Sequence, residues 1–155
     1  PMDLVGASVE DYDTLARAIQ EELGSIHHLI HGAAIFKALR PMMHQPISEW
    51  LEITQVSIHS PLLLTQALMP LLDKSTGSSI TFVIGGTALE QGAHWGSYGM
   101  SQAAREWMAR TLALELGPKG PRVRAWRPPV FYSDITAQVW PAKGQNDYIS
   151  VGEVA

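Results

Sequence analysis

Segments with helical spacing of apolar residues alternate with short apolar segments along this chain of 155 residues. Helical spacing covers residues 9–23, 48–72 and 97–116, and strand-like segments cover residues 26–31, 79–84 and 122–126. Helices that connect consecutive strands form right-handed crossovers, which place the strands parallel in one sheet. The alternation therefore predicts an α/β fold with a parallel sheet of three strands.

Local signals indicate where the first helix begins and where the first and third helices end. Ser8 and Asp11 have the spacing of a capping box, in which each side chain accepts a hydrogen bond from the other's backbone. Gly24 and Gly117 follow the last residues of the two helical patterns and are expected to end them, because glycine adopts the left-handed backbone of a helix end.

The long second helix is expected to be irregular. Ser48 is the expected N-cap, and Pro61 lies inside the pattern. Proline has no N–H and its ring crowds the preceding turn, so a kink or local break is expected near Ile58. A short helix is also expected at residues 133–139.

Composition places the chain among folded proteins and limits its partners. Apolar residues make up 46% and charged residues 17%, which is enough for a buried core. The net charge of −4 gives no reason to expect a nucleic acid as partner. The chain has no cysteine, which excludes disulfides and is typical of a cytoplasmic protein. No membrane span and no signal peptide is expected.

The segment from Trp95 to Ala104 contains Tyr98, and Gln102 follows about one helical turn later on the same face. Here the chain resembles the active-site helix of the short-chain dehydrogenase/reductase family, which reads Tyr-x-x-x-Lys. Further stretches keep the order and spacing of that family's landmarks: Asp3-Leu4, His31-Gly32-Ala33-Ala34, Val56-Ser57, Gly77-Ser78-Ser79-Ile80, Arg122-Val123-Arg124-Ala125 and Arg127-Pro128-Pro129. The resemblance implies a Rossmann-like, doubly wound parallel sheet in a three-layer α/β/α arrangement.

The resemblance also implies that residues 1–155 form a single partial domain, incomplete at both ends. In the family's order, it runs from the end of the third strand to the start of the helix after the sixth strand. The family's phosphate-binding glycine loop and its last strand are then expected outside these residues. A bare sheet edge at residues 26–31 agrees with this expectation, because parallel sheets normally lie buried.

Carried over by position, the family's catalytic tyrosine is Tyr98. The lysine place holds Gln102, the serine place holds Gly85 and the asparagine place holds Ser57. The resemblance therefore implies a degenerate active site, in which a tyrosine without a cationic neighbour keeps a pKa near roughly 10. Thr87 is an alternative to the missing serine if the loop shifts, and otherwise it is an ordinary loop threonine.

The resemblance assigns other residues to a cofactor side and a substrate side. The cofactor, NAD or NADP, is expected near Asp3, near the turn of Gly32, Ala33 and Ala34, and near Pro128 and Pro129. The substrate, a small molecule with a carbonyl or alcohol group, is expected near Thr87, His94 and Trp95; the alternative for His94 and Trp95 is packing at the surface. No metal site is expected, because His28 points to the opposite side of its strand from His27 and His31.

The helices at residues 48–72 and 97–116 are expected to join two copies in a homo-oligomer, as in the family, with Arg105 and Arg110 as charges on the second helix. Two functions from different classes remain. The first is an NAD(P)-dependent short-chain oxidoreductase whose catalysis is impaired by the replaced lysine, serine and asparagine. The second is a catalytically inactive relative that serves as a structural or interaction subunit.

Overall fold

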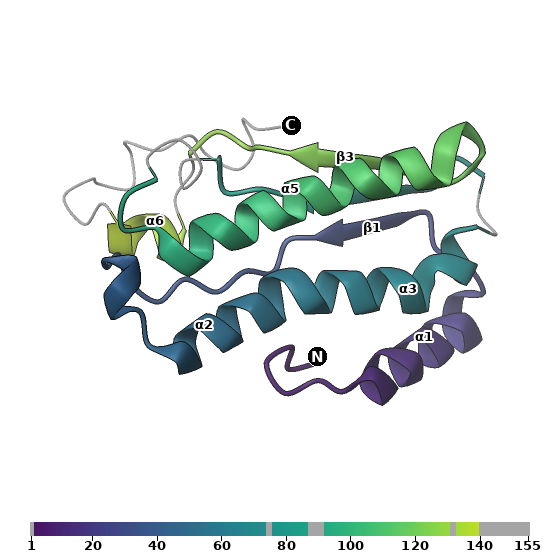
Figure 1. Ribbon diagram of the computed structural model, residues 1–155. Coiled ribbons are helices and arrows are strands. Elements are labelled where there is room, and N and C mark those ends of the chain that lie inside the picture. Colours follow the sequence, from purple (N-terminus) through teal and green to yellow (C-terminus); the bar gives the residue numbers. More distant parts are fainter. Residues whose placement is uncertain (1, 74–75, 87–91, 131–132, 140–155) are drawn as a thin grey trace.

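The structure is a computed structural model, and it describes residues 2–73, 76–86, 92–130 and 133–139 (Figure 1). Strands and helices alternate along the chain. Their order is α1 (Val9–Leu23), β1 (His28–His31), the 3₁₀ turn η1 (Met42–His44), α2 (Ile47–Thr54), the π-helical turn η2 (Gln55–His59), α3 (Ser60–Leu72), β2 (Ser79–Val83), α5 (Gly96–Leu116), the 3₁₀ turn η3 (Gly117–Lys119), β3 (Arg122–Trp126) and α6 (Asp134–Val139).

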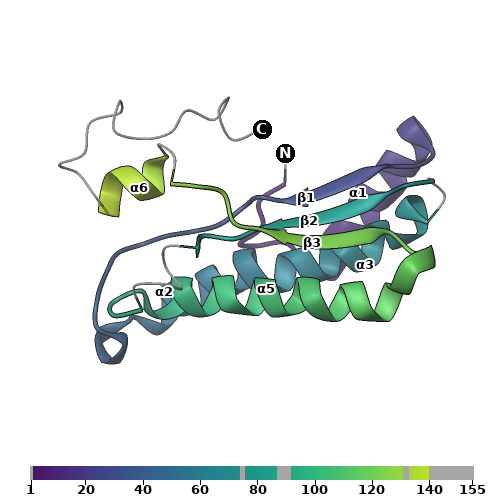
Figure 2. The same ribbon diagram turned by 90° about the horizontal axis from the view of Figure 1, so that it is seen from above.

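The described strands form one parallel sheet in the order β1-β2-β3. Leu29 pairs with Ile80, and Ile80 pairs in turn with Val123. Because the strands are parallel, all of their carboxyl ends lie at the same edge of the sheet (Figure 2). The predicted α/β class and the predicted parallel sheet of three strands are confirmed.

Helices α3 and α5 cover one face of the sheet, α2 packs against α5, α1 packs against α3, and α6 lies beyond the carboxyl ends of the strands (Figure 2). The described residues thus supply two of the three predicted layers. The strands record this asymmetry, because Leu29 and His31 of β1 are buried, whereas His28 and Ile30 on the opposite side are exposed. Ile30 is 66% exposed, which is unusual for an isoleucine in a parallel strand.

The main core lies between β2 and the helical layer. Ile80, Phe82 and Ile84 are fully buried and contact Leu72 of α3 and Ala109 of α5. Each such side chain contributes roughly 1.5–3 kcal/mol by leaving water, so this layer holds the strand ends in place. Among the described residues, no helix is both long and apolar enough to cross a membrane.

The boundaries of α1 follow the predicted signals. The Ser8 side chain accepts a hydrogen bond from the Asp11 N–H, and the Asp11 carboxylate accepts one from the Ser8 N–H, which completes the capping box. Gly24 ends the helix with a φ of +72°, in the region that favours glycine. The start of β1 differs from the prediction by two residues. Strand β1 begins at His28, because Ile26 donates its N–H to the Leu71 carbonyl at the end of α3 and not to β2.

The long second helix begins at Ile47, so the prediction that Ser48 is its N-cap is wrong. Pro46 occupies the N-cap with φ of −61°, a position where a residue without an N–H leaves no donor unpaired. The expected break at Pro61 is confirmed, because residues 55–59 form a π-helical turn between α2 and α3. Pro61 has no N–H to offer the carbonyl of Ser57, and the turn widens so that Ser60 donates to the Gln55 carbonyl.

Candidate functional site

A cavity of about 330 Å³ lies at the carboxyl edge of the sheet, where each strand gives way to a loop. This is the edge at which open parallel sheets bind their ligands. The residues that line it are Gly32, Ala34, Val83, Ile84, Gly85, Gly86, Trp95, Tyr98, Gln102, Pro128, Pro129, Val130, Ser133, Ile135 and Thr136. Among these, the phenol of Tyr98 is the one side chain that titrates.

Tyr98 lies in the first turn of α5 and is only 8% exposed. Its hydroxyl points at Gly85, where β2 has just ended. A β-carbon placed on Gly85 would lie 2.6 Å from the Tyr98 hydroxyl oxygen, closer than such atoms approach in proteins. The hydroxyl therefore occupies the space that a serine side chain at position 85 would need.

Gln102 lies one helical turn after Tyr98 and uses both ends of its amide within the protein. Its Oε1 accepts a hydrogen bond of 2.9 Å from the Gly85 N–H, and its Nε2 donates one of 3.2 Å to the Ser101 hydroxyl. The Gly85 N–H is consequently not free to stabilise an oxyanion. Gln102 also carries no charge, so it does not stabilise the phenolate form of Tyr98.

Burial raises the pKa of the Tyr98 phenol, and the positive charge of Arg105 acts in the opposite direction with a smaller effect. The prediction that Tyr98 has no cationic neighbour and keeps its ordinary pKa is therefore wrong. At neutral pH the phenol is protonated, so it is able to donate a proton, although burial makes loss of that proton more costly.

Arg105 was expected as one of the charges of the helix face that joins two copies, but it is fully buried within the chain. One guanidinium nitrogen donates to the His31 carbonyl and another donates to the Ala33 carbonyl at 2.7 Å. These carbonyls belong to the turn after β1, so Arg105 fixes the wall of the cavity that includes Gly32 and Ala34. Burial, followed by the charge of Arg105, lowers the pKa of His31 to about 4, and His31 is therefore neutral near pH 7.

Aromatic rings pack against Tyr98. Phe36 packs edge-on against Tyr98 with ring centres 5.6 Å apart, and Trp95 lies 5.7 Å from Phe36 and 5.9 Å from Tyr98. Such contacts contribute about 0.5–1.5 kcal/mol each beyond the burial of area. They fix the plane of the phenol, which orients its hydroxyl toward Gly85.

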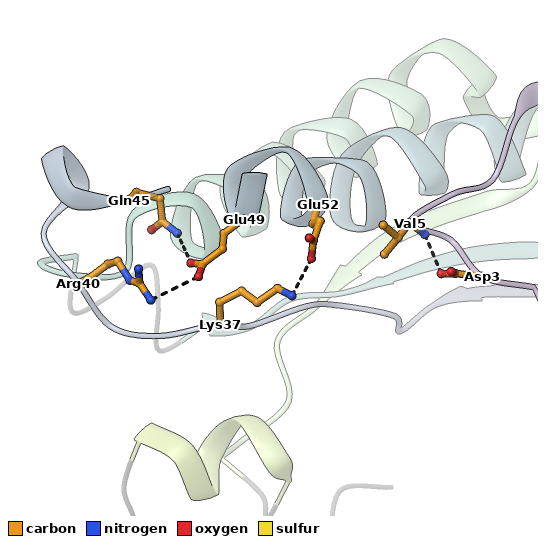
Figure 3. Close-up of polar contacts among 7 residues, drawn as sticks. All are labelled: Asp3, Val5, Lys37, Arg40, Gln45, Glu49 and Glu52. Carbon is orange, nitrogen blue, oxygen red and sulfur yellow. Dashed lines mark hydrogen bonds and ion pairs between the residues drawn. The ribbon is translucent and has the colours of Figure 1, made fainter. Parts of the chain in front are cut away.

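The loop that carries Phe36 is joined to α2 by polar side chains (Figure 3). Lys37 pairs with Glu52 at 2.6 Å, and Glu49 accepts from Arg40 at 3.4 Å and from Gln45 at 3.1 Å. Half-exposed ion pairs of this kind are individually weak, at roughly 0–1 kcal/mol. Together they hold the loop along the helix, and with it the Phe36 ring.

The structure brings some of the predicted site residues together and leaves others apart. Tyr98, Gln102, Gly85, Gly32, Ala34, Trp95, Pro128 and Pro129 all line the cavity. Asp3, Ala33, Ser57 and His94 do not. Thr87 lies outside the described residues, so the prediction that it replaces the missing serine stays a prediction.

The predicted residues outside the cavity have other contacts. Asp3 accepts a hydrogen bond of 3.0 Å from the Val5 N–H (Figure 3), and the His94 carbonyl accepts one from the Arg40 N–H at 3.1 Å. Ser57 is fully buried in the π-helical turn, and its hydroxyl has no partner among the described residues. His94 is exposed at the surface, with a φ of +67°.

Sequence reasoning missed Phe36, Arg105 and Ile135 as neighbours of the site. For Arg105 the signal was present in the sequence. Residues 98, 102 and 105 follow the i, i+4, i+7 spacing that places side chains on one face of a helix. A charged residue on the face that also carries a buried tyrosine and a buried glutamine has to be buried with them.

The cavity fits the nicotinamide end of a dinucleotide in shape. A β-carbon on Gly32 would meet nothing within 4 Å, which leaves open space at that wall, and Gly85, Gly86, Pro128 and Pro129 also line the cavity. The fit is poorer in charge, because Gln102 is neutral and no cationic side chain lines the cavity in the described part of the chain.

A family model described as short chain dehydrogenase matches residues 2–144. The chain is 32% identical over 114 residues to the uncharacterized oxidoreductase YciK of Escherichia coli K12, a match that covers 74% of this chain and 45% of the relative. It is 25% identical over 138 residues to human dehydrogenase/reductase SDR family member 4, covering 89% of this chain and 50% of the relative. The chain thus spans about half the length of these curated relatives.

Solved structures agree with these matches. A short chain dehydrogenase from Shigella flexneri superposes with a TM-score of 0.89 at 28% identity, covering 95% of this chain and 57% of that protein. A short chain dehydrogenase from E. coli CFT073, solved in complex with NADPH, superposes with a TM-score of 0.89 at 29% identity, covering 95% of this chain and 61% of that protein. The Rossmann-like fold predicted from the sequence is confirmed.

Proposed function

The chain belongs to the short-chain dehydrogenase family, and we propose that it carries the proton-donating part of an oxidoreductase that uses NAD or NADP to interconvert a carbonyl and an alcohol. We propose further that its catalysis is impaired. The observation that carries this second part is the hydrogen bond from the Gly85 N–H to Gln102 Oε1, with the Tyr98 hydroxyl filling the space beside Gly85.

A nicotinamide cofactor supplies the hydride in this chemistry when it is bound. Gly32, Ala34, Pro128 and Pro129 are the residues that would hold it, since they line the strand side of the cavity. Tyr98 donates a proton from its hydroxyl to the carbonyl oxygen of the substrate. Trp95 and Phe36 pack against the Tyr98 ring and keep it in place.

The impairment follows from groups that are engaged elsewhere. Removal of one oxyanion donor costs on the order of a hundredfold to a thousandfold in rate, and Gly85 has no hydroxyl and no free N–H to replace that donor. Loss of well-placed acid–base assistance costs roughly another 10²–10⁴-fold. These penalties do not multiply simply, because residues of one catalytic group act as a unit.

The alternative function, an inactive structural subunit, has one observation in its favour. The site satisfies itself, because Gln102, Gly85 and Ser101 bond to one another and the phenol packs against the glycine. Polar groups that are already bonded to one another gain less from a bound substrate. Cofactor binding separates the two functions.

The test is a titration of the protein with NADH and with NADPH, followed by nicotinamide fluorescence. We expect saturable binding of one of them and slow oxidation that depends on an added carbonyl compound. Slow oxidation that Tyr98→Phe reduces further would support an impaired enzyme, whereas a folded protein that binds neither cofactor would leave only the structural subunit.

We also propose that the protein is a homo-oligomer joined through α2, α3 and α5. Side chains on these helices are apolar and exposed, among them Leu51, Trp107 and Leu114. The guanidinium of Arg110 lies 5.5 Å from the centre of the Trp107 ring, which keeps that ring upright on the surface. A second copy would cover these side chains.

A further inference from the structure

Arg105 is a fully buried cation without an acidic partner in the described part of the chain. The ion pairs found there are Lys37–Glu52, Arg40–Glu49 and Arg127–Glu106, and all of them are partly exposed. Arg105 bonds only to carbonyl oxygens, and its Nε has no partner among the described residues. Buried charges normally have an opposite charge beside them, so this arginine calls for an explanation.

The position of Arg105 on its helix supplies one. Tyr98, Gln102 and Arg105 share a face of α5, and all of them are buried. Seven residues of helix rise about 10 Å, and helical side chains lean toward the N-terminus, so Arg105 reaches back toward the turn that holds Gln102. Its guanidinium then meets the carbonyls of His31 and Ala33 at the wall of the cavity.

We propose that this site accommodates a single buried cation, and that Arg105 supplies from position 105 the positive charge that Gln102 lacks. Arg105 is a positioning residue: its guanidinium fixes the His31–Ala34 turn and sets a positive potential behind the Tyr98 hydroxyl. The inference rests on the proposed function in one respect, namely that this hydroxyl is the proton donor. It explains why a neutral side chain is compatible with position 102.

The charges around the phenol agree with this assignment. His31 from β1 is held neutral by burial and by Arg105, and Gln102 from α5 carries no charge. The interaction between Arg105 and the phenol acts on both groups, since it opposes the effect of burial on each of their pKa values. Among the described residues, Arg105 is thus the charged group that acts on Tyr98.

The proposal is tested by a double-mutant cycle read by urea unfolding. Gln102→Lys adds a second cation, and Gln102→Met is its matched neutral control of similar length. With Arg105 present, we expect Lys to reduce the folding equilibrium constant at least about fivefold more than Met, because two like charges then lie close together in a buried site. With Arg105→Gln, this difference should disappear, because only one cation remains.

Arg110→Gln is the control for charge on the same helix, because Arg110 is exposed. It should leave the difference between Lys and Met at position 102 unchanged. The same difference in the presence of Arg105 and of Arg105→Gln would overturn the proposal. The cycle measures unfolding alone, so its outcome is independent of the cofactor titration that tests the proposed function.

A second comparison applies if Arg105→Gln does not fold. Arg105→Lys keeps the charge but loses the fork that binds two carbonyls at once. If the charge is what matters, Arg105→Lys folds where Arg105→Gln does not. If both variants fail to fold, Arg105 serves only as a bridge between carbonyl groups, and the proposal is wrong.

Discussion

The side chains at positions 85 and 98 occupy the same space, so each limits which residue fits at the other position. The phenol hydroxyl fills the space beside the Gly85 α-carbon, and Gln102 takes the hydrogen bond that the Gly85 N–H offers. A side chain at position 85 and a hydroxyl on residue 98 therefore exclude each other in this geometry. The replacement of serine by glycine and the burial of the tyrosine are parts of a single packing arrangement.

Because the two groups exclude each other, mutations at positions 85 and 98 should have coupled effects on the free energy of unfolding. Gly85→Ala should destabilise the protein by about 1–3 kcal/mol through overpacking. In the background of Tyr98→Phe the same change should cost at least about 1 kcal/mol less, because the clashing oxygen is gone. Urea unfolding of the four proteins measures the coupling. Equal costs of Gly85→Ala in both backgrounds would show that the hydroxyl lies elsewhere.

His31 predicts how stability depends on pH. Its folded pKa of about 4 lies below the unfolded value of 6.5. The unfolded chain therefore binds the proton more readily, and stability contributed by neutral His31 is lost as pH falls from about 6.5 toward 4. The loss is on the order of 3 kcal/mol, because each pKa unit corresponds to about 1.4 kcal/mol.

Unfolding free energies at several pH values between 7 and 4 measure this loss. His31→Gln should flatten the dependence, whereas His44→Asn, at an exposed histidine, should leave the slope of the parent protein unchanged. If the unfolding free energy of the parent protein depends on pH as weakly as that of His31→Gln, His31 is accessible to solvent protons.

At the scale of elements, the π-helical turn positions Ser60, the residue that bonds to α1. The turn brings Ser60 to a position where its hydroxyl donates to the Gln55 carbonyl at 2.8 Å and accepts from the Tyr12 hydroxyl at 2.7 Å. Tyr12 is the buried side chain of α1, so this contact fixes where α1 docks on α3. The irregular turn at Pro61 thus has a structural role.

This contact predicts non-additive mutations. Tyr12→Phe and Ser60→Ala should each cost about 1–2 kcal/mol, because each removes a buried hydrogen bond. The double change should cost less than the two single changes together, since both remove the same bond. Thermal or urea unfolding measures the three variants. Strict additivity would show that the hydroxyl groups do not interact.

Elements were predicted well from the sequence where the determining signal is local. The capping box at Ser8, the glycine stop at Gly24 and the break caused by Pro61 all depend on neighbouring residues. Strand ends were predicted less well, because β1 stops pairing where Ile26 bonds to the end of α3. Such a bond depends on the tertiary fold, which local patterns do not contain.

For the site, the sequence located the main residues but did not reveal their contacts. The resemblance located Tyr98, Gln102 and Gly85, and the structure brings them together. It did not reveal that Gln102 bonds to Gly85 or that Arg105 is buried, because both depend on how α5 packs against the strand ends. Asp3 was expected at the adenine of the cofactor; it does not line this cavity, and that expectation stays a prediction.

For the molecule as a whole, exposed apolar side chains predict assembly. Trp107 on α5 and Leu23 on α1 are both 66% exposed, yet only Trp107 lies on the helices of the proposed interface. Trp107→Glu should shift sedimentation toward the monomer, because a charge would be buried at the interface. Leu23→Glu is the matched control and should leave the assembly intact. A parent protein that sediments as a monomer would contradict the assembly.

Tyr98 is proposed as the proton donor of a site in which the lysine, serine and asparagine of the family's catalytic set are replaced. The most direct test is the ratio of carbonyl-dependent NADH or NADPH oxidation by the parent protein to that by Tyr98→Phe. We expect slow oxidation by the parent protein. We expect its rate to exceed that of Tyr98→Phe by less than about a hundredfold, because the assisting acid–base and oxyanion groups are missing. A fast parent reaction that Tyr98→Phe reduces by about ten-thousandfold or more would contradict this expectation.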